Sequence, residues 1–226
     1  IAIANKESII CGWNLIKKKL DKYKTQFIPV DSEHFSIWSL IKNNNKELID
    51  KVYITASGGP FLNWPLNKIK NVSPKKAIKH PNWSMGKKIS VDSATMMNKV
   101  FELIEAQRIF GFDRSKFKIL IHPQSLVHAI IKFNNGLTKI LVHDTNMKIP
   151  IFNSIYENLI KKIDTKNIDL SKLNNLKFKK INLRKFPSIK ILKRLPKRIS
   201  LFETILVSCN DELVDLFIKK KNNFLA

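Results

Sequence analysis

Residues 1–60 read IAIANKESIICGWNLIKKKLDKYKTQFIPVDSEHFSIWSLIKNNNKELIDKVYITASGGP, and this stretch decides the fold class. Apolar runs and helical spacing predict, in order, a strand at 1–4, a helix at 7–20, a strand at 26–30, a helix at 33–43 and a strand at 52–56. This alternation is typical of a parallel α/β layer. Ligands gather at the carboxyl ends of strands in such layers, and Lys6, Asp31 and Ser57 each follow a predicted strand.

The remaining two thirds of the chain predict a mixture of helices and strands. Asp92 or Ser93 is a good N-cap for a long helix that reaches Phe110 and that Gly111 stops. Asn134-Asn135-Gly136 is a strong hairpin turn between two apolar runs. The other predicted elements are strands at 118–121, 126–133 and 137–143 and helices at 150–163, 188–195 and 201–220.

The composition is strongly basic, with a formal charge of +23 over 226 residues. Of the 41 basic residues only five are arginines, and the chain is rich in Asn and Ile, as codon composition alone produces in an AT-rich genome. Base readers and phosphate forks prefer Arg, so we do not expect nucleic acid as a partner. A basic nucleic-acid-binding protein remains an alternative interpretation of the charge.

Other compositional features limit where the protein works. Cys11 and Cys209 lie far apart in largely apolar surroundings, which predicts buried free thiols in a reducing compartment. No apolar stretch is long enough to span a membrane, and no signal peptide is visible, so we expect no membrane partner. The chain begins at Ile1 inside an apolar run, which predicts a piece whose beginning is missing.

Three acids are candidate ligands for a divalent metal ion. Asp31 and Glu33 lie two residues apart at a strand end, and Glu102 adds a third carboxylate from the long helix. Oxygen-only ligation favours Mg²⁺ or Mn²⁺ over zinc. The alternative is that these are ordinary surface acids.

Small and cationic residues form a candidate phosphate site. The turn Ser57-Gly58-Gly59 offers backbone N–H groups and a hydroxyl, although such turns are common. Ser93 either binds phosphate or simply caps a helix. Asn98 and Lys99 follow on the same helix, and Lys99 either binds phosphate or pairs with Glu102 three residues away.

The loop from His80 to Gly86 contains Trp83 in polar surroundings. Such a Trp either belongs to a mobile lid over a substrate or anchors the loop to the core. His122 and His128 border a strand, where each is interpreted first as a core histidine satisfied by the backbone.

The chain strongly resembles the 1-deoxy-D-xylulose 5-phosphate reductoisomerases, a family of the isoprenoid pathway. The matching segments are Ala4-Asn5-Lys6-Glu7-Ser8, Pro29-Val30-Asp31-Ser32-Glu33-His34, Ser57-Gly58-Gly59-Pro60-Phe61, the run from His80 to Lys99 with Glu102, and Ile121-His122-Pro123-Gln124-Ser125 with His128. They cover most of residues 1–155 in the right order, which makes the resemblance highly specific.

The resemblance implies an activity and a set of site residues. The family makes 2-C-methyl-D-erythritol 4-phosphate by a metal-assisted rearrangement followed by hydride transfer from NADPH, with Mn²⁺ or Mg²⁺. By resemblance the metal ligands are Asp31, Glu33 and Glu102, and the catalytic residues are Lys6, Glu33 and His80. The implied substrate-binding residues are Ser32, Ser57, His80, Trp83, Ser93, Asn98, Lys99, Ser125 and His128. Met85 and Gly86 are implied at the cofactor, and Met147 is implied as a more peripheral residue.

The implied fold class is α/β: an α+β catalytic domain with a mixed sheet, followed by a partial C-terminal helical domain. The implied domains are the end of a cofactor domain at 1–30, the catalytic domain at 31–160, a linker at 161–186 and a truncated helical domain at 187–226. None of the six glycines forms G-x-G-x-x-G, so we expect the main NADPH domain to be absent and this chain alone not to reduce.

Further expectations follow from the family. The resemblance implies a sugar phosphate substrate, a homodimer at full length, and a cytoplasmic location in a bacterium or, alternatively, in a plastid-type organelle. A non-catalytic metal- and phosphate-binding paralogue is a further alternative.

Overall fold

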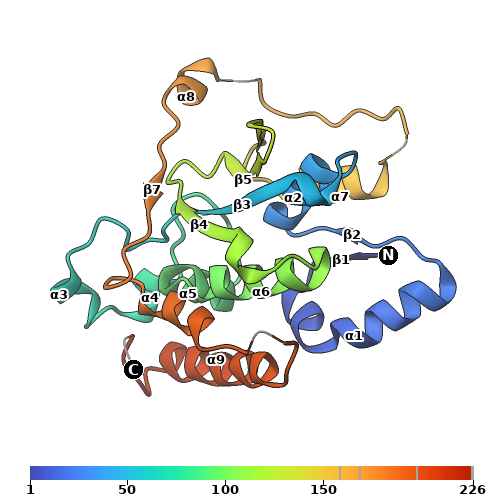
Figure 1. The fold of residues 1–226 in the computed structure, drawn as a ribbon. Helices are drawn as coiled ribbons and strands as arrows, with labels where there is room; N and C mark the ends of the chain where they lie inside the picture. The colour runs from blue at the N-terminus through green and yellow to red at the C-terminus, as the bar shows by residue number, and fades with distance from the viewer. Residues whose placement is uncertain (158, 168, 197, 225–226) are drawn as a thin grey trace.

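The computed structural model describes residues 1–157, 159–167, 169–196 and 198–224, and Figure 1 shows how their elements are arranged. Asn158 of the predicted helix 150–163, Ile168 of the predicted linker, and Lys197 and Leu225–Ala226 of the predicted helical domain lie outside the described residues.

Two separate sheets hold the predicted strands. β1 (Ala2–Ile3) and β2 (Ile28–Pro29) pair in parallel as a small two-stranded sheet. The third predicted strand, β3 (Ile49–Ala56), lies instead at the centre of a larger sheet of order β6-β5-β3-β4-β7. The prediction of one parallel layer over the first sixty residues is therefore wrong, because β3 pairs with strands that lie later in the chain.

The larger sheet is mixed, as the fold class predicts. β3 runs parallel to β4 (Phe117–Ile121) and antiparallel to β5 (Val127–Phe133). The predicted hairpin joins β5 to β6 (Thr138–Val142), and Gly136 takes the positive φ of 87° that this turn requires. β7 (Lys179–Lys180) pairs with β4, so part of the predicted linker extends the sheet.

Two N-capped helices lead out of the small sheet. α1 (Lys6–Tyr23) begins after Asn5, whose side chain accepts the backbone N–H of Ser8. α2 (Ser32–Ile41) begins after Asp31, whose carboxylate accepts the N–H of Glu33. Each cap therefore fixes a polar residue just past a strand, with Lys6 at the start of α1.

The predicted long helix is two helices. α5 (Lys87–Thr95) begins after Gly86, and α6 (Met97–Phe110) follows a single residue later. Met96 separates them with a left-handed φ of 66°. Asp92 and Ser93 lie in the second half of α5, so neither caps a helix N-terminus. Gly111 ends α6 as predicted, also with positive φ.

Short helices and α9 complete the described fold: η1 (Lys46–Leu48), α3 (Leu66–Ile69), α4 (Pro74–Ala77), η2 (Arg114–Lys116), α7 (Lys148–Ile155), α8 (Leu170–Asn174), η3 (Pro187–Lys193) and α9 (Phe202–Ile218). α7 is shorter than the predicted helix 150–163, and η3 is a 3₁₀ segment where an α-helix is predicted. Among the described residues, no helix has both the length and the apolar character needed to cross a bilayer.

The main core lies between the large sheet and α6. Val52 and Ile54 of β3 and Phe101 and Ile104 of α6 are almost fully buried there, so α6 is held firmly against the sheet. Both cysteines are exposed, which makes their predicted burial wrong. Cys11 is a solvent-facing residue beside the buried Ile10, so apolar neighbours in sequence did not imply an apolar face.

Candidate functional site

One polar pocket lies where several helices and strands end. Its volume is about 210 Å³, and it opens where β1, β2 and β3 end and where α5 and α6 meet. Its lining residues are Ala4, Lys6, Asp31, Ser32, Glu33, Thr55, Ser57, His80, Trp83, Ser84, Met85, Ile89, Ser93, Asn98, Lys99, Glu102, Ser125, His128 and Met147. Every site residue that the sequence predicts lies in this set except Gly86, which precedes α5 and is not among the described lining residues.

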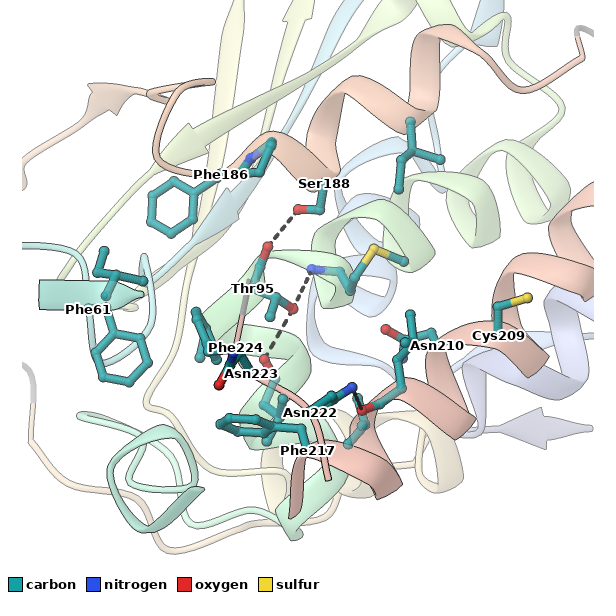
Figure 2. A pocket seen from close by; sticks show the side chains of 18 of the residues that line it. Phe61, Thr95, Phe186, Ser188, Cys209, Asn210, Phe217, Asn222, Asn223 and Phe224 are labelled. Atoms are coloured by element: carbon teal, nitrogen blue, oxygen red, sulfur yellow. Dashed lines mark hydrogen bonds between the residues drawn. The ribbon is translucent and has the colours of Figure 1, made fainter. Parts of the chain in front are cut away.

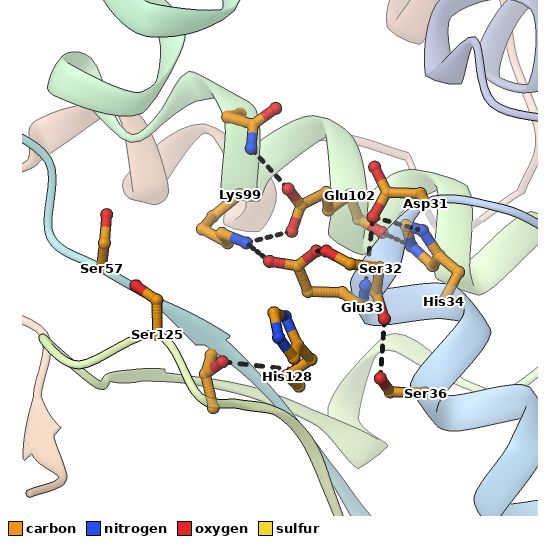
Figure 3. A network of polar contacts seen from close by, with 12 residues as sticks. Asp31, Ser32, Glu33, His34, Ser36, Ser57, Lys99, Glu102, Ser125 and His128 are labelled. Atoms are coloured by element: carbon orange, nitrogen blue, oxygen red, sulfur yellow. Dashed lines mark hydrogen bonds and ion pairs between the residues drawn. The ribbon is translucent and has the colours of Figure 1, made fainter. Parts of the chain in front are cut away.

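Three carboxylates converge on one side of the pocket (Figure 3). Asp31 caps α2, Glu33 lies in the first turn of α2, and Glu102 projects from α6. One carboxylate oxygen from each lies within 4.8 Å of those of the other two. Asp31 is 8% exposed and Glu102 only 1%, so they are not ordinary surface acids.

Two lysines balance the charge of these acids. Lys6 Nζ lies 2.9 Å from Asp31 Oδ2. Lys99 Nζ lies 2.5 Å from Glu33 Oε1 and also contacts Glu102 Oε2. Lys99 and Glu102 are thus the pair that their spacing allowed, but the pair is buried rather than solvated.

Burial and neighbouring charges shift the pKa values of the carboxylates in this cluster in opposite directions. Burial, reinforced by the neighbouring Glu33, raises the pKa of Glu102 to about 8. Burial would also raise the pKa of Asp31, but the charge of Lys6 outweighs it and holds that pKa well below its usual range. For Lys99, the nearby carboxylates outweigh burial and raise the pKa of its ammonium.

A second layer of charge lies behind the carboxylates. His34 Nδ1 lies 3.3 Å from both Asp31 Oδ1 and Glu105 Oε2, while His34 Nε2 bonds to the backbone oxygen of Glu102 at 2.7 Å. Burial would lower the pKa of His34, but Glu105 and Asp31 outweigh it and raise the pKa to about 10. A protonated His34 therefore joins the two acids and orients Asp31.

Glu105 has no counterpart in the sequence-based prediction. It is 0% exposed and does not line the pocket. The available signal was an acid three residues after Glu102, among the apolar positions that face the core. Asp31, His34 and Glu105 form a second group with ligand-like spacing, and it shares Asp31 with the first.

The donor set of the first group fits a hard divalent cation. Its three carboxylates supply oxygen only, which suits Mg²⁺ or Mn²⁺, and the pocket gives them access to solvent and ligand. The second group is enclosed in the interior and already has a cationic partner in His34. Asp31, Glu33 and Glu102 are therefore the better candidate metal site.

Ser57 and His80 form the other end of the pocket. His80 Nδ1 accepts the backbone N–H groups of Asn82 and Trp83 at 3.1 and 2.9 Å, so this nitrogen carries no proton. His80 Nε2–H then donates to Ser57 Oγ at 2.9 Å. Because Ser57 Oγ also accepts the Gly59 N–H, its own proton is available for an anionic ligand.

His80 is expected to remain neutral well below its ordinary titration range. Burial, and to a smaller extent the charge of Lys99, lower the pKa of His80 to about 4. Unfolded chains protonate histidine near pH 6.5, so the stability that His80 contributes is lost as the pH falls from about 6.5 to about 4. Following the His80 ring by NMR between pH 3 and 8 should give a midpoint near 4, and a midpoint near 6.5 would contradict this geometry.

The predicted loop containing Trp83 lies over the pocket. The Trp83 ring meets the His128 ring edge-on at 6.0 Å between centroids. Asn82 Nδ2 donates to Pro123 O and to Ser125 Oγ, both at 2.7 Å. Trp83 is therefore a wall of the pocket, and its neighbour Asn82 anchors the loop.

The two histidines of the strand region differ. His122 is fully buried and bonds through Nδ1 to the backbone oxygen of Lys177, as expected for a core histidine. His128 is also bound to backbone, through His143 O, but it lines the pocket as well.

A second cavity lies on the other side of α5 (Figure 2). Its volume is about 280 Å³, and its wall is mainly apolar, with Phe61, Phe186 and Phe217 among its lining residues. Among the described residues that line it, Lys185 is the one charged group, and its ammonium donates to the Leu62 and Trp64 carbonyls. None of its described lining residues offers a carboxylate, so it is not the candidate catalytic site.

The fold and the polar pocket together define a class, that of α/β proteins with a carboxylate-rich site suited to a divalent cation beside a glycine turn whose serine hydroxyl can donate to an anion. Two family models match the chain: the 1-deoxy-D-xylulose 5-phosphate reductoisomerase C-terminal domain over residues 27–110 and the DXP reductoisomerase C-terminal domain over residues 143–226.

Individual relatives agree with the family models. A 1-deoxy-D-xylulose 5-phosphate reductoisomerase of Pelagibacter ubique is 67% identical over 224 residues, which are 99% of this chain and 58% of the relative. The Zymomonas mobilis reductoisomerase, solved in complex with NADPH, is 32% identical with a TM-score of 0.88, over 99% of this chain and 58% of that one. A DOX-P reductoisomerase solved with NADPH, fosmidomycin and magnesium is 35% identical with a TM-score of 0.90. The match covers 100% of this chain and 58% of that one.

The chain belongs to the 1-deoxy-D-xylulose 5-phosphate reductoisomerase family. It spans 58% of the length of the relatives described above.

Proposed function

We propose that this chain carries the metal- and substrate-binding part of an NADPH-dependent 1-deoxy-D-xylulose 5-phosphate reductoisomerase. The observation that carries the proposal is the convergence of Asp31, Glu33 and Glu102 with two lysines and the Ser57 turn in one pocket. A relative that holds NADPH, fosmidomycin and magnesium supports the same assignment.

The chain's own residues would divide the work between the two ends of the pocket. Asp31, Glu33 and Glu102 would hold Mg²⁺ or Mn²⁺, and a bound divalent ion supplies polarisation of a substrate carbonyl. Lys6, at 7% exposure beside Asp31, would face the reacting oxygens together with Ser32. Both residues would stabilise negative charge that develops on those oxygens.

The phosphate end would orient the substrate. The free hydroxyl proton of Ser57 would donate to a phosphate oxygen, and Ser93, Asn98 and Lys99 line the same pocket. Holding a remote phosphate uses binding energy to position the reacting carbons. Trp83, packed on His128, would help to exclude water from that space.

The remaining features of the proposal follow the family. NADPH would approach beside Met85, which lines the pocket, and Gly86, which follows it in the chain. We also propose manganese as an acceptable metal, the division into domains predicted above, a homodimer and a bacterial cytoplasmic location.

Calorimetric titration of the chain with 1-deoxy-D-xylulose 5-phosphate tests the proposal. We expect saturable binding in the presence of Mg²⁺ and at least about tenfold weaker binding after EDTA treatment, because the metal would contact the substrate directly. Binding of duplex DNA with a steep salt dependence and no response to metal would instead indicate a nucleic-acid-binding protein. Binding of neither ligand would contradict the substrate assignment and leave a non-catalytic paralogue.

A further inference from the structure

Two residues of the proposed phosphate site are bound to the proposed metal site. Lys99 Nζ lies 2.5 Å from Glu33 Oε1 and contacts Glu102 Oε2, and Asn98 Nδ2 lies 2.5 Å from Glu102 Oε1. Both oxygens of Glu102 therefore accept hydrogen bonds from α6 itself. Figure 3 shows the end of Lys99 between Glu102 and Glu33, with Ser57 on the other side of the view.

A divalent ion at this site would need the same oxygens. The Lys99 ammonium and a bound ion would both require Glu33 and Glu102, and two cations a few ångströms apart repel each other strongly in a poorly solvated interior. The ion would therefore bind only as Lys99 leaves the carboxylates.

A displaced Lys99 would need a new anionic partner. Its side chain is 7% exposed, so its ammonium cannot be fully hydrated without a large movement. Burying an unpaired ammonium is costly. The polar pocket extends from Lys99 to Ser57 and Ser93, where a phosphate would meet hydroxyl groups and the turn that follows β3.

We propose that Lys99 is an internal cation that holds the carboxylate site in the absence of metal and moves to the phosphate group when metal and ligand bind together. Metal and phosphate would then bind with positive cooperativity, since each removes the obstacle to the other. This inference rests on the proposed function, because it takes the metal and phosphate positions from it.

The test is the affinity of the 226-residue chain for Mn²⁺, measured by EPR of the free ion with and without inorganic phosphate. For the unaltered chain we expect phosphate to tighten Mn²⁺ binding at least about fivefold, the lower end of typical coupling between sites. In Lys99→Met, Mn²⁺ should bind about tenfold more tightly without phosphate, and phosphate should no longer change the affinity.

Lys88→Met is the matched control. Lys88 also joins several acids, at 2.7 Å from Glu7 and 3.1 Å from both Asp92 and Asp211, but it does not line the polar pocket. We expect it to bind Mn²⁺ like the unaltered chain and to keep the phosphate effect. This control separates the role of Lys99 from a general loss of positive charge.

The outcomes distinguish this inference from the proposed function. If the unaltered chain binds Mn²⁺ with the same affinity with and without phosphate, the proposed movement of Lys99 is refuted, while the metal site is still supported. The same holds if Lys99→Met binds Mn²⁺ no better than the unaltered chain. If the unaltered chain binds no Mn²⁺, the metal site itself is wrong and the inference fails with it. The phosphate measurement on the unaltered chain decides the matter even if Lys99→Met does not fold.

Discussion

Replacing Glu102 with glutamine is expected to weaken Mn²⁺ binding by at least about 100-fold, because even residues that only support metal ligands contribute 10- to 100-fold. Glutamine keeps the size of the side chain in the tightly packed α6 but removes the charge of one of three clustered acids. Isothermal titration of the folded variant with Mn²⁺ measures the effect, and circular dichroism confirms the fold.

Glu105→Gln is the matched control, because Glu105 lies one turn further along α6 and is equally buried. Its carboxylate faces His34 rather than the pocket and only supports the ligand Asp31, so we expect its loss to weaken Mn²⁺ binding by about tenfold, the lower end for such residues. If Glu105→Gln lost more affinity than Glu102→Gln, the enclosed group of Asp31, His34 and Glu105 would be the metal site. The pair of variants thus decides between the two carboxylate groups that share Asp31.

The position of the candidate site is predictable from the sequence because its residues lie at the ends of strands and helices that local sequence patterns define. Lys6, Asp31 and Ser57 each follow a strand that their own apolar neighbours define, and α6 places Glu102 one turn after Asn98 and Lys99. The resemblance to a family supplied the choice among these residues. Spacing alone left Asp31 and Glu33 as either metal ligands or surface acids.

Sheet pairing and the break at Met96 were not predictable from local patterns. β3 pairs with β4 and β5, which lie more than sixty residues later, so the pattern of the first sixty residues carried no information on its partners. The helix break falls within Thr95-Met96-Met97, where nothing in the sequence stops a helix. A left-handed methionine is tolerated there because its side chain is buried in the core, at 1% exposure.

The break at Met96 also affects the end of the pocket that Ser57 and Ser93 line. With α5 ending at Thr95, the Ser93 carbonyl lies in its last turn and faces the glycine turn after β3. A Cβ on Gly59 would lie 2.7 Å from Ser93 O and 3.0 Å from Ala94 Cα. Gly59 therefore allows two backbones to approach closely, and it does so with a φ of 67° that other residues rarely adopt.

Gly59→Ala is accordingly expected to lower the free energy of unfolding by about 2 to 5 kcal/mol. This is the sum of about 1–2 kcal/mol for placing alanine in a left-handed backbone conformation and about 1–3 kcal/mol for the steric overlap of the new Cβ with α5. Urea denaturation measures the loss. Gly111→Ala is the control, since Gly111 has a similar φ of 71° but open space around the new Cβ, so only the first penalty applies. Equal losses in the two variants would mean that the turn does not approach Ser93. A larger loss at Gly59 would confirm the close contact between this turn and α5, the two elements that carry Ser57 and Ser93.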